Sequence, residues 1–335
     1  MKVAIVGGGI VGLSTALNLK NEFRDSKITI IASSFEDTTS HVAAGIFRVA
    51  SSFSGPTDEI TWKWIKDSYE YYDDIRKTEE AALAGITNVS GYIFAKSSPY
   101  AIKNQWMEKL LPIYRKVTPE ELKLVEGGWK YGSFFMTILN ETSLHLPWAR
   151  QKLILNGTVL VEKTVNSLKE ITKNFDLVIN CSGLGARELC NDRHLVPIRG
   201  QVTKVKAPWI KTFFYGENDT YIIPGFNGIC TLGGVRAFDS ENREFCPHDA
   251  ASIRERCVKL IPSLSKAEVV RHMTGLRPHR EGNVRVELEK ISDEFSSKMV
   301  VHNYGHGGYG VSTAPGTAKY AVELAKETRR MSSKL

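Results

Sequence analysis

The sequence of 335 residues has no long apolar run, no block of basic residues and no paired cysteine motif. No apolar stretch approaches the roughly 18 residues that a membrane-spanning helix needs, so no transmembrane segment is predicted. Lys and Arg never occur more than two in a row, and the net charge of +7 comes from 44 basic and 37 acidic residues spread through the chain. This spread indicates a solvated surface rather than a nucleic-acid interface, with a mild attraction for anionic substrates.

The cysteines are too few and too scattered to form a framework. They are Cys181, Cys190, Cys230, Cys246 and Cys257. They include no C-x-x-C pair and no histidine spacing typical of zinc, so no metal site is predicted. An odd number without a pairing motif indicates free thiols in a reducing compartment.

The first 32 residues fit two different structures. A basic residue followed by an apolar run resembles a secretory signal, but three glycines in the spacing G-x-G-x-x-G also open a dinucleotide-binding fold. We favour the second interpretation, because residues 2–6 predict a strand, residues 10–17 have helical spacing, and residues 27–32 (KITIIA) predict a second strand. Gly7 then permits the turn, Gly9 lets the backbone approach a pyrophosphate, and Gly12 lets the helix pack on the strand.

One part of the dinucleotide-binding pattern is missing. An acidic residue normally ends the second strand and binds the ribose, whereas this strand runs into Ala32, Ser33 and Ser34. Glu36 and Asp37 follow a few residues later. A serine hydroxyl can still bind a ribose, so the pattern is weakened rather than lost.

Similar segments recur far along the chain. Residues 175–180 (FDLVIN) and 298–304 (KMVVHNY) predict buried strands, and a helix is predicted over about 317–329. Between them lie a helix-rich region, about 59–83, and a strand-rich region, 196–236. The sequence therefore predicts an α/β protein with a discontinuous Rossmann-like domain, interleaved with a mixed and mainly antiparallel substrate domain. We assign residues 1–50, 140–192 and 298–335 to the first domain and residues 51–139 and 193–297 to the second.

Nine stretches, in order, together resemble the D-amino-acid oxidase and D-aspartate oxidase family over nearly the whole chain. They are VAIVGGGIVGLST (3–15), VAAGI (42–46), NCSGLGA (180–186), RGQ (199–201), APW (207–209), YIIPG (221–225), TLGG (231–234), TGLRP (274–278) and HNYGHGGYG (302–310). The resemblance implies an enzyme that holds FAD non-covalently and removes a hydride from the α-carbon of a D-amino acid. The products implied are a 2-oxo acid, ammonia and, after reoxidation by O2, hydrogen peroxide.

The resemblance also implies the residues of the cofactor site. Those predicted to bind FAD are Gly7, Gly9, Ile10, Val11, Gly12, Ser33, Ser34, Thr38, Thr39, Ala44, Gly45, Val165, Ser182, Gly183, His306, Gly307, Gly308, Tyr309 and Gly310. The helix after the last glycine loop is expected to point its positive end at the flavin and to stabilise the reduced ring. No side chain is predicted as a general base, because hydride transfer from a neutral amine needs none.

Five residues are implied for the substrate. Arg277 of GLRP would bind the α-carboxylate through two parallel hydrogen bonds, which a planar guanidinium suits. Tyr221 of YIIPG would donate its hydroxyl to the same carboxylate, and the carbonyl of Gly308 would accept from the amine. Arg236 of TLGGVR, just after the strand that carries TLGG, stands where family members that oxidise acidic substrates carry an arginine, and predicts D-aspartate and D-glutamate. Tyr215 falls in the lid where such members commonly carry another arginine, which puts strict acidic specificity in doubt.

Two alternatives stay open, and the last three residues bear on location. The alternatives are a broader or neutral D-amino-acid oxidase and, in another class, a flavin- or NAD-binding protein without turnover. The chain closes with Ser333, Lys334 and Leu335, the tripeptide that an import receptor reads as a peroxisomal address. We therefore expect a peroxisomal enzyme whose partners are a small D-amino acid, O2 and that receptor, with no nucleic acid and no membrane; the oligomeric state is not predicted.

Overall fold

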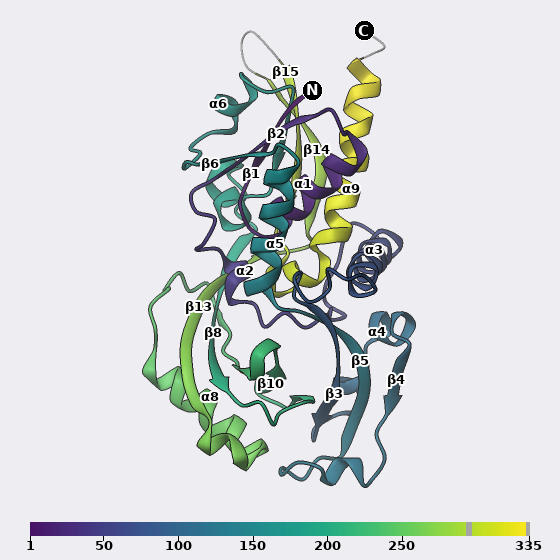
Figure 1. The fold of residues 1–335 in the computed structure, drawn as a ribbon, viewed down its shortest axis with the longest axis vertical. Helices are drawn as coiled ribbons and strands as arrows, with labels where there is room; N and C mark the ends of the chain where they lie inside the picture. The colour runs from purple at the N-terminus through teal and green to yellow at the C-terminus, as the bar shows by residue number, and fades with distance from the viewer. Residues whose placement is uncertain (293–296, 333–335) are drawn as a thin grey trace.

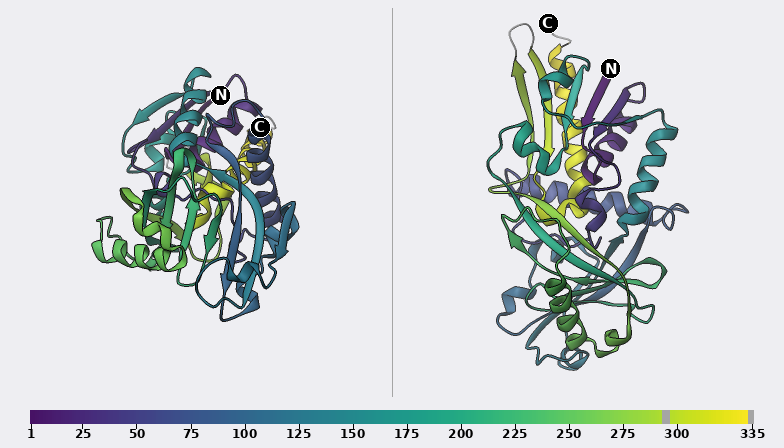
Figure 2. Two further views of the ribbon diagram at one scale, coloured as in Figure 1. Left: turned by 60° about the horizontal axis from the view of Figure 1, so that its bottom comes forward. Right: turned by 90° about the vertical axis from the view of Figure 1, so that its left-hand side faces the viewer.

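A computed structural model describes residues 1–292 and 297–332 of the chain. Two β-sheets form its two halves. In Figure 1 the sheet that contains β1 (Lys2–Val6) and β2 (Lys27–Ala32) lies above the sheet that contains β3 (Ile86–Ala95) and β5 (Tyr131–Asn140). Segments from both ends of the chain meet in the upper half, where the N-terminal strand and the C-terminal helix lie close together (Figures 1 and 2). The predicted interleaved α/β architecture is confirmed.

The upper sheet has six strands in the order β14-β15-β7-β1-β2-β6. Their bounds are β1 Lys2–Val6, β2 Lys27–Ala32, β6 Val159–Glu162, β7 Leu177–Asn180, β14 Arg285–Ser292 and β15 Ser297–Tyr304. Five of them run parallel, and β14 pairs antiparallel with β15 at the edge. The apolar runs of β1 and β7 are buried along their length apart from Lys2, as expected where helices cover both faces of a parallel sheet.

The lower sheet has nine strands and is mainly antiparallel. The order is β12-β8-β11-β10-β9-β3-β5-β4, with β13 also paired to β8. The bounds are β3 Ile86–Ala95, β4 Ile113–Lys116, β5 Tyr131–Asn140, β8 Leu195–Lys206, β9 Phe213–Tyr215, β10 Tyr221–Pro224, β11 Ile229–Gly233, β12 Ala237–Phe238 and β13 Glu268–Arg280. The pair β3 and β9 is the parallel exception.

Helices cover the upper sheet and join the halves. The α-helices are α1 Ile10–Glu22, α2 Thr39–Val42, α3 Asp58–Arg76, α4 Gln105–Leu110, α5 Thr142–Leu155, α6 Leu168–Thr172, α7 Ala186–Leu189, α8 Pro247–Leu260 and α9 Gly310–Ser332. The 3₁₀ helices are η1 Pro99–Ile102, η2 Glu121–Lys123, η3 Gly183–Gly185, η4 Phe226–Gly228, η5 Pro262–Lys266 and η6 Gly307–Tyr309. Among the residues described, no helix combines the length and apolar character needed to cross a membrane. All five cysteines are free thiols, as predicted.

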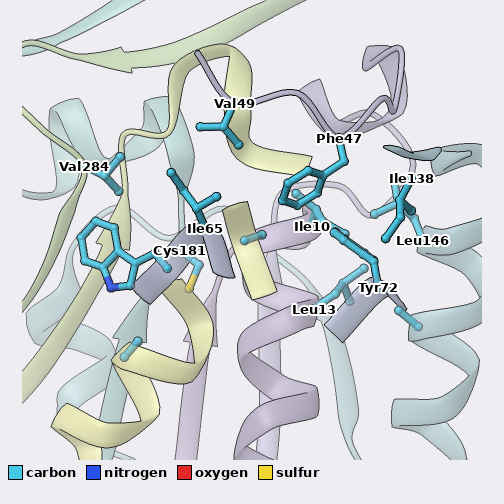
Figure 3. Close-up of a cluster of buried hydrophobic side chains, with 14 of the residues drawn as sticks. Ile10, Leu13, Phe47, Val49, Ile65, Tyr72, Ile138, Leu146, Cys181 and Val284 are labelled. Atoms are coloured by element: carbon cyan, nitrogen blue, oxygen red, sulfur yellow. The ribbon is translucent and has the colours of Figure 1, made fainter. Parts of the chain in front are cut away.

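The core is continuous between the halves. Figure 3 shows Ile10 and Leu13 of α1 near Phe47 and Tyr72, which come from the segment before α3 and from α3 itself. The Tyr72 hydroxyl donates to the carbonyl of Val311 at 2.6 Å and so ties α3 to α9. This shared core fixes the lower sheet relative to the upper one, which is what a site built from both requires.

One boundary of the predicted domains differs. Residues 285–292 fall in the predicted substrate-binding domain (193–297), whereas the structure places them in the upper sheet as β14. The reason is the pairing of β14 with β15 over eight residues, from Arg285 opposite Tyr304 to Ser292 opposite Ser297. The helix predicted over about 317–329 also begins earlier, at Gly310.

Candidate cofactor and substrate site

Most residues predicted to bind the cofactor lie at the carboxyl ends of the parallel strands. The first glycine turn follows β1, Ser33 to Thr39 follow β2, Val165 follows β6, Ser182 and Gly183 follow β7, and residues 306–310 follow β15. Ligands of open α/β sheets bind at this edge. Ala44 and Gly45 come from the segment just after α2. The fold therefore brings most of the predicted set to one edge, although the set came from six separate parts of the sequence.

The three glycines of the first turn differ in what their hydrogen atoms face. A Cβ at Gly7 would lie 2.2 Å from the carbonyl oxygen of Cys181, and one at Gly12 would lie 2.0 Å from the carbonyl oxygen of Gly7. These two glycines are required by the packing of the chain itself. A Cβ at Gly9 would instead meet the Ser40 hydroxyl at 3.1 Å and no other atom closer than 3.8 Å. The space beside Gly9 thus suits the close approach of a phosphate.

The start of α1 suits an anionic group. Gly9 precedes the helix without a side-chain cap, and the first turn holds no acidic residue. The N–H of Ile10 donates to the Ser40 hydroxyl at 3.0 Å. A helix N-terminus without a local negative charge favours phosphate through its dipole and its free N–H groups. These features fit the pyrophosphate of FAD, with Gly9, Val11 and Ser40 around it.

The two acidic residues that follow β2, Glu36 and Asp37, are both paired with arginines. The Ser34 hydroxyl accepts from the N–H groups of Glu36 and Asp37, at 3.1 and 3.0 Å, and shapes the turn. Glu36 pairs with Arg150, and this hydrogen bond lowers the pKa of the Glu36 carboxyl. Asp37 pairs with Arg243 at 2.6 Å. Both carboxylates already have cationic partners, which leaves the exposed Ser33 as the polar side chain nearest the end of β2.

Two threonines of this segment make contacts within the protein. The Thr38 hydroxyl lies 2.9 Å from His41 Nδ1, and the Thr39 hydroxyl donates to the carbonyl of Leu276 at 2.8 Å. The second bond joins the cofactor edge directly to β13, one residue before Arg277. Gly45 is likewise fixed from within, because a Cβ there would lie 1.9 Å from the carbonyl oxygen of Asn140.

The loop after β15 is anchored by a buried histidine. His306 Nε2 lies 2.9 Å from the Thr317 hydroxyl, and the backbone of His306 forms an isolated antiparallel β-bridge with that of His279 in β13. Burial lowers the pKa of His306 to about 3, so the ring is neutral at physiological pH. Its role here is to hold the turn against α9 and β13. The first turn of α9, which begins at Gly310, holds no acidic residue, so its positive end is unopposed locally.

Arg277 projects from β13 into a space kept open by glycine. β13 pairs with β8, and a Cβ at Gly200 of β8 would lie 2.4 Å from both terminal nitrogens of Arg277. Arg277 Nη1 donates to the carbonyls of Arg199 and Val235, at 3.3 and 3.2 Å. Within residues 1–292 and 297–332, Nε and Nη2 have no hydrogen-bond partner. Two carbonyls hold Nη1, whereas Nε and Nη2, which we call the open side of the guanidinium, keep their donors for a carboxylate.

Tyr221 and Gly308 lie close to Arg277. A Cβ at Gly308 would be 3.3 Å from Arg277 Cδ, so the loop after β15 packs directly on this side chain. Burial raises the pKa of the Tyr221 phenol, although the Arg277 charge opposes the rise. A Cβ at Gly233 would be 2.4 Å from the Tyr221 hydroxyl oxygen, so this glycine makes room for the ring. The structure therefore brings three of the predicted substrate residues together, with the phenol protonated and able to donate.

Arg236 is near this group but is already paired. Its Nη2 lies 3.3 Å from Asp219 Oδ1, and the two side chains are 50% and 44% exposed. Asp219 stands in the tight turn between β9 and β10, where Asn218 and Asp219 both adopt positive φ angles of 56°. The charge of Arg236 still acts on the Tyr221 phenol. A substrate carboxylate that uses Arg236 has to compete with Asp219.

Tyr215 contacts both Tyr221 and Arg48, an arginine that is not among the predicted site residues. The Tyr215 and Tyr221 ring centroids are 5.6 Å apart. On Tyr215 the guanidinium carbon of Arg48 lies 4.7 Å from the ring centroid. Burial raises the pKa of the Tyr215 phenol, and the positive charge of Arg48 partly offsets that rise. Tyr215 is therefore a neutral, partly buried ring in contact with a cation.

Three residues of this site were missed as site residues. Gly200 and Gly233 occur within the quoted RGQ and TLGG motifs. No strand is predicted over residues 268–280, so the pairing of β13 with β8 that sets Gly200 beside Arg277 was not expected. Only Phe47 separates Arg48 from the VAAGI motif. Its contact with Tyr215 joins positions 167 residues apart, for which the sequence carries no local signal.

With the geometry established, comparisons with known proteins identify the class. The family model described as FAD dependent oxidoreductase matches residues 2–324. The glycine oxidase of Geobacillus kaustophilus is a solved structure with the same fold, with a TM-score of 0.80 at 18% identity over 97% of this chain and 94% of that one. The fold and the cofactor edge are thus those of an FAD-dependent oxidoreductase.

Curated relatives narrow the family. Human D-aspartate oxidase is 36% identical over 97% of this chain and 95% of the relative. A D-amino acid oxidase of Dugesia ryukyuensis is 31% identical over 98% of both chains. The chain belongs to the D-amino-acid oxidase and D-aspartate oxidase family, and its cofactor is FAD, as the sequence resemblance predicted.

The arrangement defines what the chain's own residues can do. When bound, FAD supplies a hydride acceptor at the carboxyl edge of the upper sheet. Arg277 can hold a carboxylate through Nε and Nη2, with Tyr221 as a second donor. The carbonyl of Gly308, beside Arg277, can accept from an amine. The only histidine predicted in the site, His306, is neutral and bonded to Thr317, so it is poorly placed to take a proton.

Proposed function

We propose that this chain oxidises D-amino acids with acidic side chains, D-aspartate and D-glutamate. The reaction removes a hydride from the α-carbon and leaves an imino acid, which water hydrolyses to a 2-oxo acid and ammonia. The two electrons pass to O2, which becomes hydrogen peroxide. The anchored carboxylate and amine set the stereochemical preference, because they decide which face of the α-carbon is presented to the cofactor.

One observation carries the proposal: the open side of the Arg277 guanidinium lies beside Gly308 and near Tyr221, at the cofactor edge. A protein that only stored flavin would have no use for a carboxylate site placed there. Arg277 is kept open by Gly200, which faces its terminal nitrogens. This supports turnover of an amino acid over a binding-only role.

Acidic specificity is supported by Arg236 and by the names of relatives. Human D-aspartate oxidase and D-aspartate oxidase 1 of Caenorhabditis elegans are 36% and 30% identical to the chain. A broader D-amino-acid oxidase is the second candidate. It is favoured by Tyr215, a ring in place of a charged lid residue, and by the pairing of Arg236 with Asp219.

Replacing Arg277 tests the function. We expect Arg277→Ala to retain FAD and to lower kcat/KM for D-aspartate at least about 100-fold, because a carboxylate loses a charge-assisted pair of hydrogen bonds. Peroxide release and flavin absorbance are the measurements. The control is Arg271→Ala, an exposed arginine of the same strand. Unchanged kinetics in Arg277→Ala would refute the assignment.

We also propose that the enzyme is imported into peroxisomes. Its support is the closing tripeptide Ser333, Lys334 and Leu335, which lies outside the described residues. A fluorescent protein fused ahead of the last ten residues should enter peroxisomes, and the same fusion without the final three should stay outside. Equal distribution of the two fusions would contradict the proposal.

A further inference from the structure

Arg48 is held in place by its neighbours along the chain. The N–H of Asn140 donates to the carbonyl of Gly45, and the N–H of Phe47 donates to the carbonyl of Ile138, both at 2.8 Å. On the other side, the Asn104 amide donates to the carbonyl of Val49 at 2.7 Å. The backbone at Arg48 is therefore fixed between β5 and the start of α4, and this fixes the point from which its side chain extends.

The guanidinium of Arg48 lacks a counter-charge. Its Nε is buried and has no hydrogen-bond partner. Over the described ranges, 1–292 and 297–332, no carboxylate forms an ion pair with it. Its guanidinium carbon lies 4.7 Å from the centroid of the Tyr215 ring, and its charge also acts on the Tyr114 phenol. A partly buried cation without an anionic partner is costly, because its desolvation is not offset. Such a group indicates that an anion belongs beside it.

The other two arginines near the substrate residues are committed differently. Arg277 is backed by two carbonyls and open for the α-carboxylate. Arg236 is half exposed and already neutralised by Asp219. A dicarboxylic substrate therefore brings one more negative charge than these two provide for. Of these three arginines, Arg48 is the one left to pair with the second carboxylate of the substrate.

We propose that the guanidinium of Arg48 binds the side-chain carboxylate of the substrate and is the main determinant of acidic specificity. Tyr215 links Arg48 to the substrate residues, since its ring contacts both Arg48 and Tyr221. Arg48 thus takes the place of the lid arginine that this sequence lacks, and Arg236 can assist it where the substrate competes successfully with Asp219. This inference rests on the proposed function and specifies its substrate pocket.

The competing explanation is that Arg48 only supports Tyr215 through a cation–π contact. The two explanations differ in their effect on selectivity. Loss of support for a ring would affect all D-amino acids alike, whereas loss of a carboxylate partner would affect D-aspartate and D-glutamate in particular. The ratio of kcat/KM between D-aspartate and D-alanine separates them.

The experiment uses the FAD-loaded Arg48→Met variant, with Arg48→Lys as the charge-retaining variant. We expect the D-aspartate to D-alanine ratio of kcat/KM to fall about 10- to 100-fold in Arg48→Met, and to recover in part in Arg48→Lys. The matched control is Arg115→Met, because Arg115 also stands 4.7 Å over an aromatic ring, that of Phe134, but is paired with Glu121. An unchanged ratio in Arg48→Met would overturn the proposal.

A binding measurement keeps the test independent of turnover. Succinate and butyrate have the same number of carbons, and only succinate carries a second carboxylate. By calorimetry, Arg48→Met should weaken succinate binding at least about 10-fold more than butyrate binding. Equal weakening would again refute the role of Arg48. If the wild-type protein turned over no D-amino acid, the proposed function would fail, and the succinate comparison would still decide on Arg48.

Discussion

Replacing Asp219 with Asn is expected to lower KM for D-aspartate. The structure pairs Asp219 with Arg236 at 3.3 Å, and each side chain is about half exposed. Asn fits the backbone well, because Asp219 has φ of 56°, a conformation in which Asn is favoured among non-glycine residues. The change therefore removes a charge and leaves the turn between β9 and β10 in place.

The magnitude follows from the exposure of the pair. Ion pairs between exposed side chains contribute about 0.2–1 kcal/mol, since solvent and salt screen them. A substrate carboxylate near Arg236 no longer competes with this interaction in Asp219→Asn. KM for D-aspartate should fall by up to about fivefold, the equivalent of about 1 kcal/mol. KM for D-alanine, which has no second carboxylate, should change much less.

Steady-state peroxide release at low and high salt is the assay. The difference in KM between Asp219→Asn and the wild type should shrink at high salt, because salt already screens the Arg236–Asp219 pair in the wild type. The control is Glu70→Gln on α3, which removes the partner of Lys66 in a pair of similar exposure at 3.6 Å. A rise in KM for D-aspartate would show that Asp219 positions Arg236 for the substrate, and equal changes for both substrates would show that Arg236 does not discriminate between them.

Three further substitutions test the cofactor turn and one buried histidine, His145. Gly9→Ala should weaken FAD binding at least about 10-fold with little loss of apoprotein stability, while Gly12→Ala should cost about 3 kcal/mol or more of unfolding free energy, because its Cβ would meet the carbonyl of Gly7. Flavin titration measures the FAD affinity, and urea unfolding measures the stability. Similar behaviour of both variants would contradict the assignment of Gly9 to phosphate binding and of Gly12 to packing. Burial lowers the pKa of His145 to about 4, so the folded state resists a proton that the unfolded state takes up near pH 6.5, and stability falls as pH drops below that value. In His145→Asn the loss of unfolding free energy between pH 7 and 5.5 should be about 1 kcal/mol smaller than in the wild type, and an unchanged pH profile would show that His145 is not the group responsible.

The cofactor edge was predictable because its signals are local. The spacing of Gly7, Gly9 and Gly12 between an apolar strand and a helix defines the turn within a dozen residues. The parallel order of β1, β2 and β7 then follows from their buried runs. The arrangement of Arg277 and Tyr221 came from the family resemblance, and the structure adds the glycines that make room for both.

What the sequence did not show depends on pairing over long distances. The strand β14 reads as an ordinary strand, and only its pairing with β15 decides which sheet it joins. Arg48 stands in a segment whose place is set by bonds to β5, some ninety residues later. The neutralisation of Arg236 by Asp219 likewise depends on a turn that folds back beside it.

Anaerobic mixing of the purified, FAD-loaded protein with D-aspartate, D-alanine and L-aspartate tests the central claim most directly. Flavin absorbance is followed in each case, so that the step with O2 plays no part. We predict that the absorbance bleaches fastest with D-aspartate, more slowly with D-alanine and not at all with L-aspartate. Bleaching mainly with D-alanine would contradict the acidic specificity, and the absence of bleaching with both D-amino acids would contradict the proposed function.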